Sequence, residues 1–210
     1  MRVPNDYDKA KAYDGQAMPQ ITVGGHICRI RNAMIQQART SGKDMLVLTF
    51  DVCEQGEWNG YYQRRFERSV KYNPNASWPG VFRTGVANAE GNTSGFFKAV
   101  IEAVEASNTG YNFKATGFNE TTLQGKLIGF NFGEEEYEPQ NSPGEIRTIV
   151  KPQFAVSVAK VQEGVIPPAI KRLNANGNGG NGGGYGYQQQ PASPPMPGMP
   201  ASGEDDELPF

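Results

Sequence analysis

The chain has 210 residues, 37% of them hydrophobic, and a formal net charge of −2. Its 26 glycines and 15 prolines, set against that modest hydrophobic content, argue against a chain that folds along its whole length. No apolar run reaches membrane-spanning length, and residues 1–15 lack the apolar core of a signal peptide. These features argue against a membrane partner and predict a cytoplasmic protein.

Charge is distributed unevenly along the chain. All 20 Lys and Arg residues lie at or before Arg172, whereas Glu204, Asp205, Asp206 and Glu207 lie together near the C-terminus. With those four acids set aside, 18 of the 22 acids remain against 20 cations, so residues 1–173 carry a net charge of +2. A mildly basic body with a separate acidic end is typical of proteins that bind nucleic acid or a protein partner.

Three segments in the first part of the chain have strand character. They are residues 21–35, 44–54 and 60–69. In the second segment Leu46, Leu48, Phe50 and Val52 alternate, which places them on one face of a strand. The third segment, GYYQRRFERS, follows the turn-like EQGEWNG. Together the three segments predict an antiparallel meander.

One segment, residues 93–110, has the periodicity of an amphipathic helix. Its apolar stripe consists of Phe96, Phe97, Val100, Ile101 and Val104. Thr93 or Ser94 is available as the N-terminal cap, and Gly110 is available as the terminator. The segment therefore predicts a helix with its own start and stop signals.

Strand character returns at residues 125–133 and 146–161, on either side of a turn. The order of three strands, one helix and two strands predicts a mainly β protein with an OB-fold. This fold is a five-stranded Greek-key barrel, here with its helix between strands three and four. We assign this domain to residues 1–173. The connection 69–92 is so long that we expect it to contain local structure or function.

Residues 174–203 have a different composition from the body. They contain no charged residue and no Ile, Leu, Val, Phe or Trp. Such a segment buries too little apolar surface to offset its loss of conformational entropy. We therefore expect a disordered linker with roughly 30 Å between its ends. The linker precedes a distinct tip, residues 204–210, with the sequence EDDELPF.

The predicted body interleaves aromatic and basic side chains, most densely in residues 60–69. Cations neutralise phosphates, and flat rings stack on unpaired bases at about 1 to 3 kcal/mol each, so this mixture is typical of sites for single-stranded nucleic acid. The predicted phosphate contacts are Arg29, Arg31, Lys43, Arg64, Arg65 and Arg83. The predicted stacking residues are Trp58, Tyr61, Tyr62, Trp78 and Phe82.

Each of these residues has an ordinary structural alternative. A Tyr on a strand usually packs against its neighbours, and an Arg on a strand is usually only solvated. We expect Phe66 to point inward, whereas Trp58 and Trp78 lie in polar connections where packing constrains a side chain less. The prediction therefore depends on the cluster rather than on any single member.

The chain has no recognisable catalytic constellation. His26 with Cys28 and Cys53 lacks a second pair of residues at ligand spacing, so we predict no metal site and interpret both cysteines as structural. The acidic run GEEEYE, residues 133–138, is typical of a charged hairpin end. With one histidine and none of the common nucleophile, phosphate-loop or zinc-protease motifs, we predict a protein that is not an enzyme and needs no cofactor.

The tip combines its carboxylates with an apolar ending, for which a generic solubility tail has no need. The acids attract a basic pocket, Leu208 and Phe210 provide apolar anchors, and Pro209 restricts the unbound ensemble. Behind a Gly/Gln/Pro-rich linker, this tip resembles that of bacterial single-stranded DNA-binding proteins. The resemblance implies that replication, recombination and repair proteins bind Asp205, Asp206, Glu207, Leu208, Pro209 and Phe210.

A second resemblance covers more of the chain. The segments GGHICRIRNA, YYQRRF, WPGVFRTG, NTSGFFKAVIEA and GKLIGFNFGEEEYE are similar to a group of single-stranded DNA-binding proteins encoded by phages and prophages of Gram-positive bacteria. This resemblance implies a body that binds single-stranded DNA in a bacterial cell or a phage-infected host. It leaves homo-oligomerisation open, because phage versions can be monomers or dimers whereas the bacterial family forms tetramers.

The leading hypothesis is a non-enzymatic, sequence-tolerant single-stranded DNA-binding protein that coats exposed strands and recruits partners through its tip. Three alternatives stay open. The first is an RNA-binding OB module, which uses the same groove chemistry. The second is an adaptor or recombination mediator whose body binds protein. The third is a nuclease that uses the acids of residues 133–138 with magnesium.

Overall fold

The computed structural model describes residues 18–139 and 142–173. The chain divides into two parts, Met1–Ala175 and Asn176–Phe210, and all the described residues belong to the first. The predicted linker, residues 174–203, and the predicted tip, residues 204–210, lie outside the described residues.

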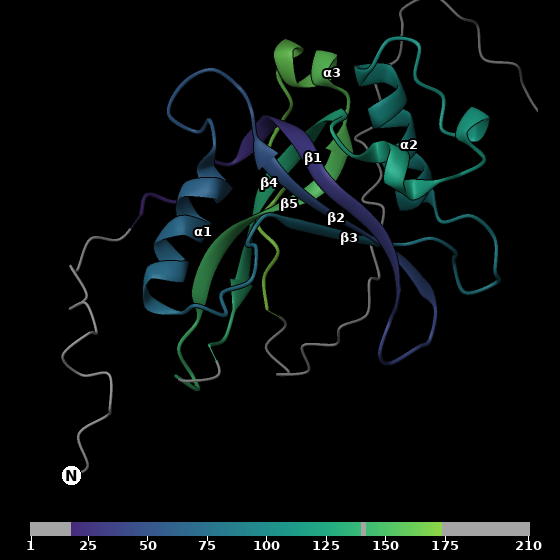
Figure 1. Ribbon diagram of the computed structural model, residues 1–210. Helices are drawn as coiled ribbons and strands as arrows, with labels where there is room; N and C mark the ends of the chain where they lie inside the picture. The colour runs from purple at the N-terminus through teal and green to yellow at the C-terminus, as the bar shows by residue number, and fades with distance from the viewer. Residues whose placement is uncertain (1–17, 140–141, 174–210) are drawn as a thin grey trace, which may run out of the picture. The chain divides into compact units, whose positions relative to one another are not determined.

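The described residues form one five-stranded antiparallel sheet with several helices (Figure 1). The strands are β1 (Gly24–Gln37), β2 (Asp44–Val52), β3 (Val81–Gly85), β4 (Leu127–Tyr137) and β5 (Arg147–Val156). The helices are α1 (Tyr61–Tyr72), α2 (Gly95–Ser107), α3 (Val158–Glu163), η1 (Lys114–Thr116) and η2 (Glu120–Leu123). Hydrogen bonding places the strands in the order β3-β2-β1-β4-β5. The prediction of a mainly β body is confirmed.

Most of the predicted elements are present. The predicted strands that the structure contains are 21–35 (β1), 44–54 (β2), 125–133 (β4) and 146–161 (β5, followed by α3). The alternating apolar residues of β2, from Leu46 to Val52, are all buried. The predicted helix is α2, it lies between β3 and β4, and its Val100 and Val104 are buried. The periodicity of apolar residues was sufficient to predict these elements from the sequence.

The predicted third strand at residues 60–69 is wrong, because this segment forms α1. The carboxylate of Asp51, in β2, accepts hydrogen bonds from the backbone N–H groups of Tyr62 (2.9 Å) and Gln63 (3.2 Å) in the first helical turn. Gly60 at the N-cap position has no side chain with which to cap the helix, so the acceptor from β2 takes that role. The third strand is β3, inside the connection 69–92.

An aromatic cluster on the inside of the sheet shows how strongly the sheet curls. Phe82 lies in β3 and Phe130 in β4, and β2 and β1 separate these two strands. Adjacent strands lie about 4.8 Å apart, so a flat sheet would hold β3 and β4 about 14 Å from each other. The ring centroids of Phe82 and Phe130 are only 5.0 Å apart, and the ring of Phe50 in β2 lies 4.7 Å from that of Phe130.

Helix α2 fills the space between the two edges of the curled sheet. It contacts β3 and β5, which are the edge strands, and also β4. Its buried side chains belong to the same core as Phe50, Phe82 and Phe130. Figure 1 shows α1 and α2 on opposite flanks of the sheet. The inside of the sheet is therefore occupied, and a ligand has access to its outer face and its connections.

Part of that outer face is covered by α3. Gly129 in β4 and Gly25 in β1 lie directly beneath Val161 of α3, since a Cβ on either glycine would come within 2.6 Å and 3.1 Å of the valine methyl groups. Glycine at both positions allows this close approach. Away from this cover, Arg29 of β1 and Arg83 of β3 are exposed. The uncovered part of the outer face thus carries cations that the sequence singled out.

Replacing Gly129 by Ala should lower the free energy of unfolding by about 1 to 3 kcal/mol, because the new Cβ would force α3 away from β4. Urea unfolding followed by circular dichroism measures the change. Gly85→Ala in β3 is the control, since a Cβ there would lie an ordinary 3.5 Å from the Ala87 carbonyl oxygen. An equal loss in both variants would contradict the close approach of α3 as the cause.

Replacing Asp51 by Ala removes the acceptor for the N–H groups of Val52, Tyr62 and Gln63. We expect the free energy of unfolding to fall by about 1 to 3 kcal/mol, measured by guanidinium titration. Asp44, an exposed residue at the start of the same strand, is the matched control, and Asp44→Ala should change stability by less than about 0.5 kcal/mol. Wild-type stability in Asp51→Ala would mean that α1 forms without its acceptor.

Candidate nucleic-acid interface

Trp78 and Arg31 form the central pair of the candidate interface. The Trp78 indole N–H donates to the carbonyl oxygen of Phe50 at 3.0 Å, which anchors the ring to β2. The guanidinium carbon of Arg31 lies 3.9 Å from the centroid of this ring, and Arg31 Nη1 donates to Gln63 Oε1 at 2.5 Å. The cation–π contact and the hydrogen bond fix the guanidinium plane at an exposed position. Both residues were predicted, and the structure brings them together.

Arg29 is exposed on β1 and reaches toward β4. Its Nη1 donates to the carbonyl oxygen of Gly125, just before β4 begins, at 3.0 Å. In the β1–β2 pairing Arg29 lies opposite Asp51, whose carboxylate already binds N–H groups of α1. Arg29 and Arg31 therefore reach in different directions from one strand, the first toward β4 and the second toward the connection after α1.

Lys43 and Arg83 place two more predicted cations on or beside neighbouring strands. Lys43 precedes β2, and its Nζ donates to the carbonyl oxygen of Asn88 at 3.2 Å. Arg83 is exposed in β3, where it pairs with Val47 of β2. Both side chains are exposed to solvent.

Helix α1 carries the remaining predicted cations, Arg64 and Arg65. The Arg64 guanidinium donates to the carbonyl oxygens of Asn59 and Glu57, the latter at 2.6 Å. Arg65 Nη1 donates to the Tyr61 hydroxyl at 3.2 Å. Both arginines therefore turn back onto the start of the helix and its preceding loop.

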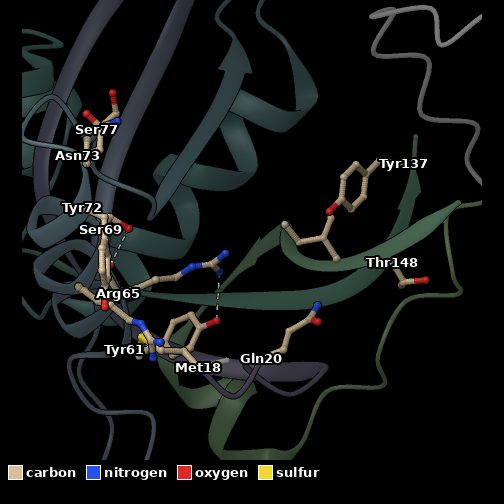
Figure 2. Close-up of a pocket in the computed structure, with 13 residues that line it drawn as sticks. Met18, Gln20, Tyr61, Arg65, Ser69, Tyr72, Asn73, Ser77, Tyr137 and Thr148 are labelled. Atoms are coloured by element: carbon tan, nitrogen blue, oxygen red, sulfur yellow. Dashed lines mark hydrogen bonds between the residues drawn. The ribbon is translucent and has the colours of Figure 1, made fainter. Parts of the chain in front are cut away.

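A cavity of about 750 Å³ lies between α1 and residues of β4 and β5 (Figure 2). The residues that line it include Arg65 and Arg68 and no acid. Figure 2 shows Arg65 extending toward the Tyr61 hydroxyl, while Tyr137 and Thr148 stand on the opposite wall. The chemistry of the lining, cationic and rich in hydroxyl groups, suits an anion.

The cavity adjoins the Trp78 and Arg31 pair. Ser77 lines the cavity, and Trp78 is the next residue in the chain. Gln63, which binds Arg31, lies on α1 as Arg65 does. The cavity and the aromatic pair are therefore linked through α1 and through the segment that carries Ser77 and Trp78.

Five of the six predicted cations share a feature: the groups that hold them are uncharged. Backbone carbonyl oxygens, an amide oxygen or a phenol hydroxyl accept from Arg29, Arg31, Lys43, Arg64 and Arg65. Elsewhere among the described residues, glutamates form ion pairs with Lys98, Arg147, Lys151 and Lys171. Within the part of the chain that the structure describes, these five cations are thus held by neutral acceptors and form no ion pair with a carboxylate.

Three of the predicted stacking residues are wrong, because their rings belong to the core. Tyr61, Tyr62 and Phe82 are only 2%, 5% and 6% exposed. The helical backbone of α1 turns both tyrosines inward, where Tyr62 lies edge to face with Phe50 at 5.3 Å, and Phe82 faces the inside of the curled sheet. None of the three offers a ring to a base.

The other aromatic predictions have mixed outcomes. Trp58 is half-buried, and its ring lies edge to face with that of Tyr61 at 5.7 Å. Phe66, which we expected to point inward, is half-buried as well, with its ring 5.4 Å from the Trp78 ring. Trp78 is half-buried too, and what distinguishes it is that the indole hydrogen bond and the Arg31 contact fix its ring.

Sequence reasoning missed Arg68 and Tyr72, which line the cavity together with Arg65. On a strand these three positions would be divided between two faces. On a helix, spacings of three and seven residues place them on one face. The signal was present in the spacing, and the wrong secondary structure concealed it.

His26 and Cys28 are buried, and Cys53 is half-buried. His26 is buried, with Nδ1 2.7 Å from Glu54 Oε1 and Nε2 2.9 Å from the Thr22 carbonyl oxygen, so both ring nitrogens are engaged. Burial raises the pKa of the Cys28 thiol well above its usual value and also raises that of Cys53. A raised thiol pKa favours the unreactive protonated form, in keeping with a structural role.

Within residues 18–139 and 142–173, no three His, Cys, Asp or Glu side chains are grouped so as to hold a metal ion. The acidic run at residues 133–138 instead takes part in ion pairs, since Glu135 contacts both Lys151 and Lys171. No helix in this part of the chain is long and apolar enough to cross a membrane.

A comparison of the chain with protein-family models found no match, and a comparison with curated proteins found none either. The interface is therefore interpreted from its own geometry.

Proposed function

We propose that the chain is a non-enzymatic single-stranded DNA-binding protein with an OB-fold body. It coats exposed strands with little dependence on sequence, and it recruits replication, recombination and repair proteins through its C-terminal tip. The DNA-binding part rests on the outer face of the sheet and on the cavity beside α1.

The arrangement of the sheet supports the OB-fold. The antiparallel order β3-β2-β1-β4-β5, with a helix between β3 and β4, is the order of a Greek-key barrel that opens between β3 and β5. The close contact between Phe82 and Phe130 supports the curvature that a barrel needs. Among the described residues β3 and β5 do not pair, and α2 contacts both of them. Helix α1 is an addition to this plan.

The observation that carries the proposal is the set of five cations that, among residues 18–139 and 142–173, are held by neutral acceptors and not by a carboxylate. A guanidinium that donates to one neutral acceptor keeps its full charge and further N–H groups for a phosphate oxygen. By contrast, a cation paired with a glutamate must first give up that partner. Phosphate binding by such cations releases counterions from the strand, which is a contribution independent of sequence.

Arg31 and Trp78 supply the stacking part of the mechanism. The indole is held by its N–H, and the guanidinium carbon lies 3.9 Å from the ring centroid. Unpaired bases stack both on aromatic rings and on guanidinium planes. Beyond Trp78, the cavity with Arg65 and Arg68 extends the basic surface for the phosphates of the same strand.

The recruiting part of the proposal is supported by sequence. The tip, residues 204–210, resembles the partner-binding tip of bacterial single-stranded DNA-binding proteins, and segments of the body are similar to the phage and prophage group. Because Asp205 and Asp206 carry the same charge as phosphate, the tip is suited to a basic pocket on a protein rather than to DNA.

The chain has 2 tryptophans, and a Trp58→Phe variant keeps only Trp78. Its fluorescence should fall on titration with oligo-dT, because a stacked base quenches the indole, and should change little with duplex DNA of equal length. Trp78→Phe, which keeps Trp58, should respond less. Equal quenching by duplex would contradict single-strand binding. Tighter binding of RNA would favour the RNA-binding module, and no binding of any oligonucleotide would favour the adaptor.

Arg31→Gln should weaken oligo-dT binding about tenfold at low salt and reduce the slope of log K against log salt by about 0.7, the loss of one phosphate contact. Fluorescence anisotropy across a salt series measures both. Arg147→Gln is the control, because Arg147 is exposed but paired with Glu145, and it should change neither quantity. Deletion of residues 204–210 should leave binding in place. A slope that Arg31→Gln does not alter would contradict the phosphate contact.

A further inference from the structure

Phe118 is the most exposed aromatic side chain among the described residues, at 63%. It lies between η1 and η2, in the connection from α2 to β4. Within the described residues it is also the one non-glycine residue with a positive φ, 59°. This backbone conformation disfavours a residue with a Cβ, and the exposed ring contributes little burial in return. Because neither the positive φ nor the exposed ring stabilises the fold, we infer that Phe118 has a role in binding.

The turn that carries Phe118 is held by its own hydrogen bonds. The N–H of Gly117 donates to the Lys114 carbonyl oxygen at 3.1 Å, and the N–H of Phe118 donates to that of Phe113 at 3.3 Å. Beneath the turn, the buried Phe113 ring lies edge to face with the Phe118 ring at 5.8 Å. The ring is thus presented from an ordered turn, which reduces the entropy lost when a ligand stacks on it.

A second pair of one cation and one aromatic ring lies in the same connection. The Lys126 ammonium is 4.7 Å from the centroid of the Tyr111 ring. The Tyr111 hydroxyl is hydrogen-bonded to Thr122 at 2.8 Å, which fixes the ring. This pair repeats the chemistry of Arg31 on Trp78 with different residues.

Arg29 links this connection to the outer face of β1. It donates to the carbonyl oxygen of Gly125, the residue before Lys126. The Trp78 ring is anchored to β2, Arg29 lies on β1, and Lys126 precedes β4, so the three follow the order of the strands. Two strand spacings, roughly 10 Å, separate β2 from β4. A single DNA strand that crosses the outer face from β2 to β4 therefore meets Trp78 first, then Arg29 and then Lys126.

We propose that Phe118 is a base-stacking residue at the β4 end of the single-strand path, next to a phosphate contact at Lys126. This inference rests on the proposed function and extends it to the connection between α2 and β4. A base is the occupant that fits, rather than an apolar surface of a protein partner, because Arg29 and Lys126 form no ion pair with a carboxylate among the described residues.

Phe118→Asn in the full-length chain removes the ring but keeps a residue that tolerates the left-handed conformation. Its affinity for long oligo-dT should fall about tenfold, with an unchanged salt slope because no charge is lost. Short oligo-dT that reaches only the Trp78 end of the path should bind Phe118→Asn almost as tightly as it binds the wild-type chain. Ile146→Asn is the matched control, since Ile146 is 62% exposed, and it should bind as the wild-type chain does.

Phe118→Trp, in a chain whose Trp58 and Trp78 are both replaced by Phe, reports contact directly, and long oligo-dT should quench it. Unchanged affinity of Phe118→Asn for long oligo-dT, or an unquenched Trp at 118 while anisotropy shows binding, would overturn the inference and leave the proposed function standing. A wild-type chain that binds no single strand would overturn the proposed function as well, so the two failures are distinguishable.

Discussion

The contact between Phe82 and Phe130 inside the sheet constrains most of the rest of the structure. It brings β3 and β4 together although two strands lie between them, so the sheet has to curl. Once curled, both edge strands reach α2, and the apolar side chains of the helix complete the core. The inside is then full, and α3 covers part of the outside above Gly25 and Gly129. What is left for a ligand is the outer face around β1 to β3 and the connections that border it.

Local patterns of apolar residues were sufficient to predict the strands and the helix whose apolar face is regular. The alternation in β2 and the apolar stripe of α2 describe the faces that are in fact buried. Helix α1 was beyond such reasoning, because its first turn is capped by Asp51 from another strand and its two tyrosines pack on residues distant in sequence. Within residues 60–69 the dense aromatic and basic residues are compatible with a strand as well as with a helix, and the acceptor from β2 stabilises the helix.

The same limit explains which site residues could be predicted. An arginine stays at the surface whether its segment is a strand or a helix, since its charge needs solvation, and Arg64 is exposed although its element was misassigned. A tyrosine can be core or surface, so the error in secondary structure moved Tyr61 and Tyr62 to the wrong side. Trp78 is half-buried and packs against the core, with its indole N–H anchored to β2. Phe118 has no sequence signal of comparable strength, because what marks it is a backbone angle.

Among the described residues, the placement of the acids leaves the predicted arginines of β1 and α1 bound to neutral acceptors. Glu134, Glu135 and Glu136 lie on β4, and Glu135 is engaged with Lys151 and Lys171, so this acidic run is partly neutralised by the strand and segment beside it. Asp51 lies close to Arg29 but binds the N–H groups of α1. The stabilising role of Asp51 thus removes a carboxylate that would otherwise compete for the arginine. Cations on one surface repel one another, which disfavours the folded body. Under the proposed function, a bound polyanion relieves that repulsion and so binds more tightly.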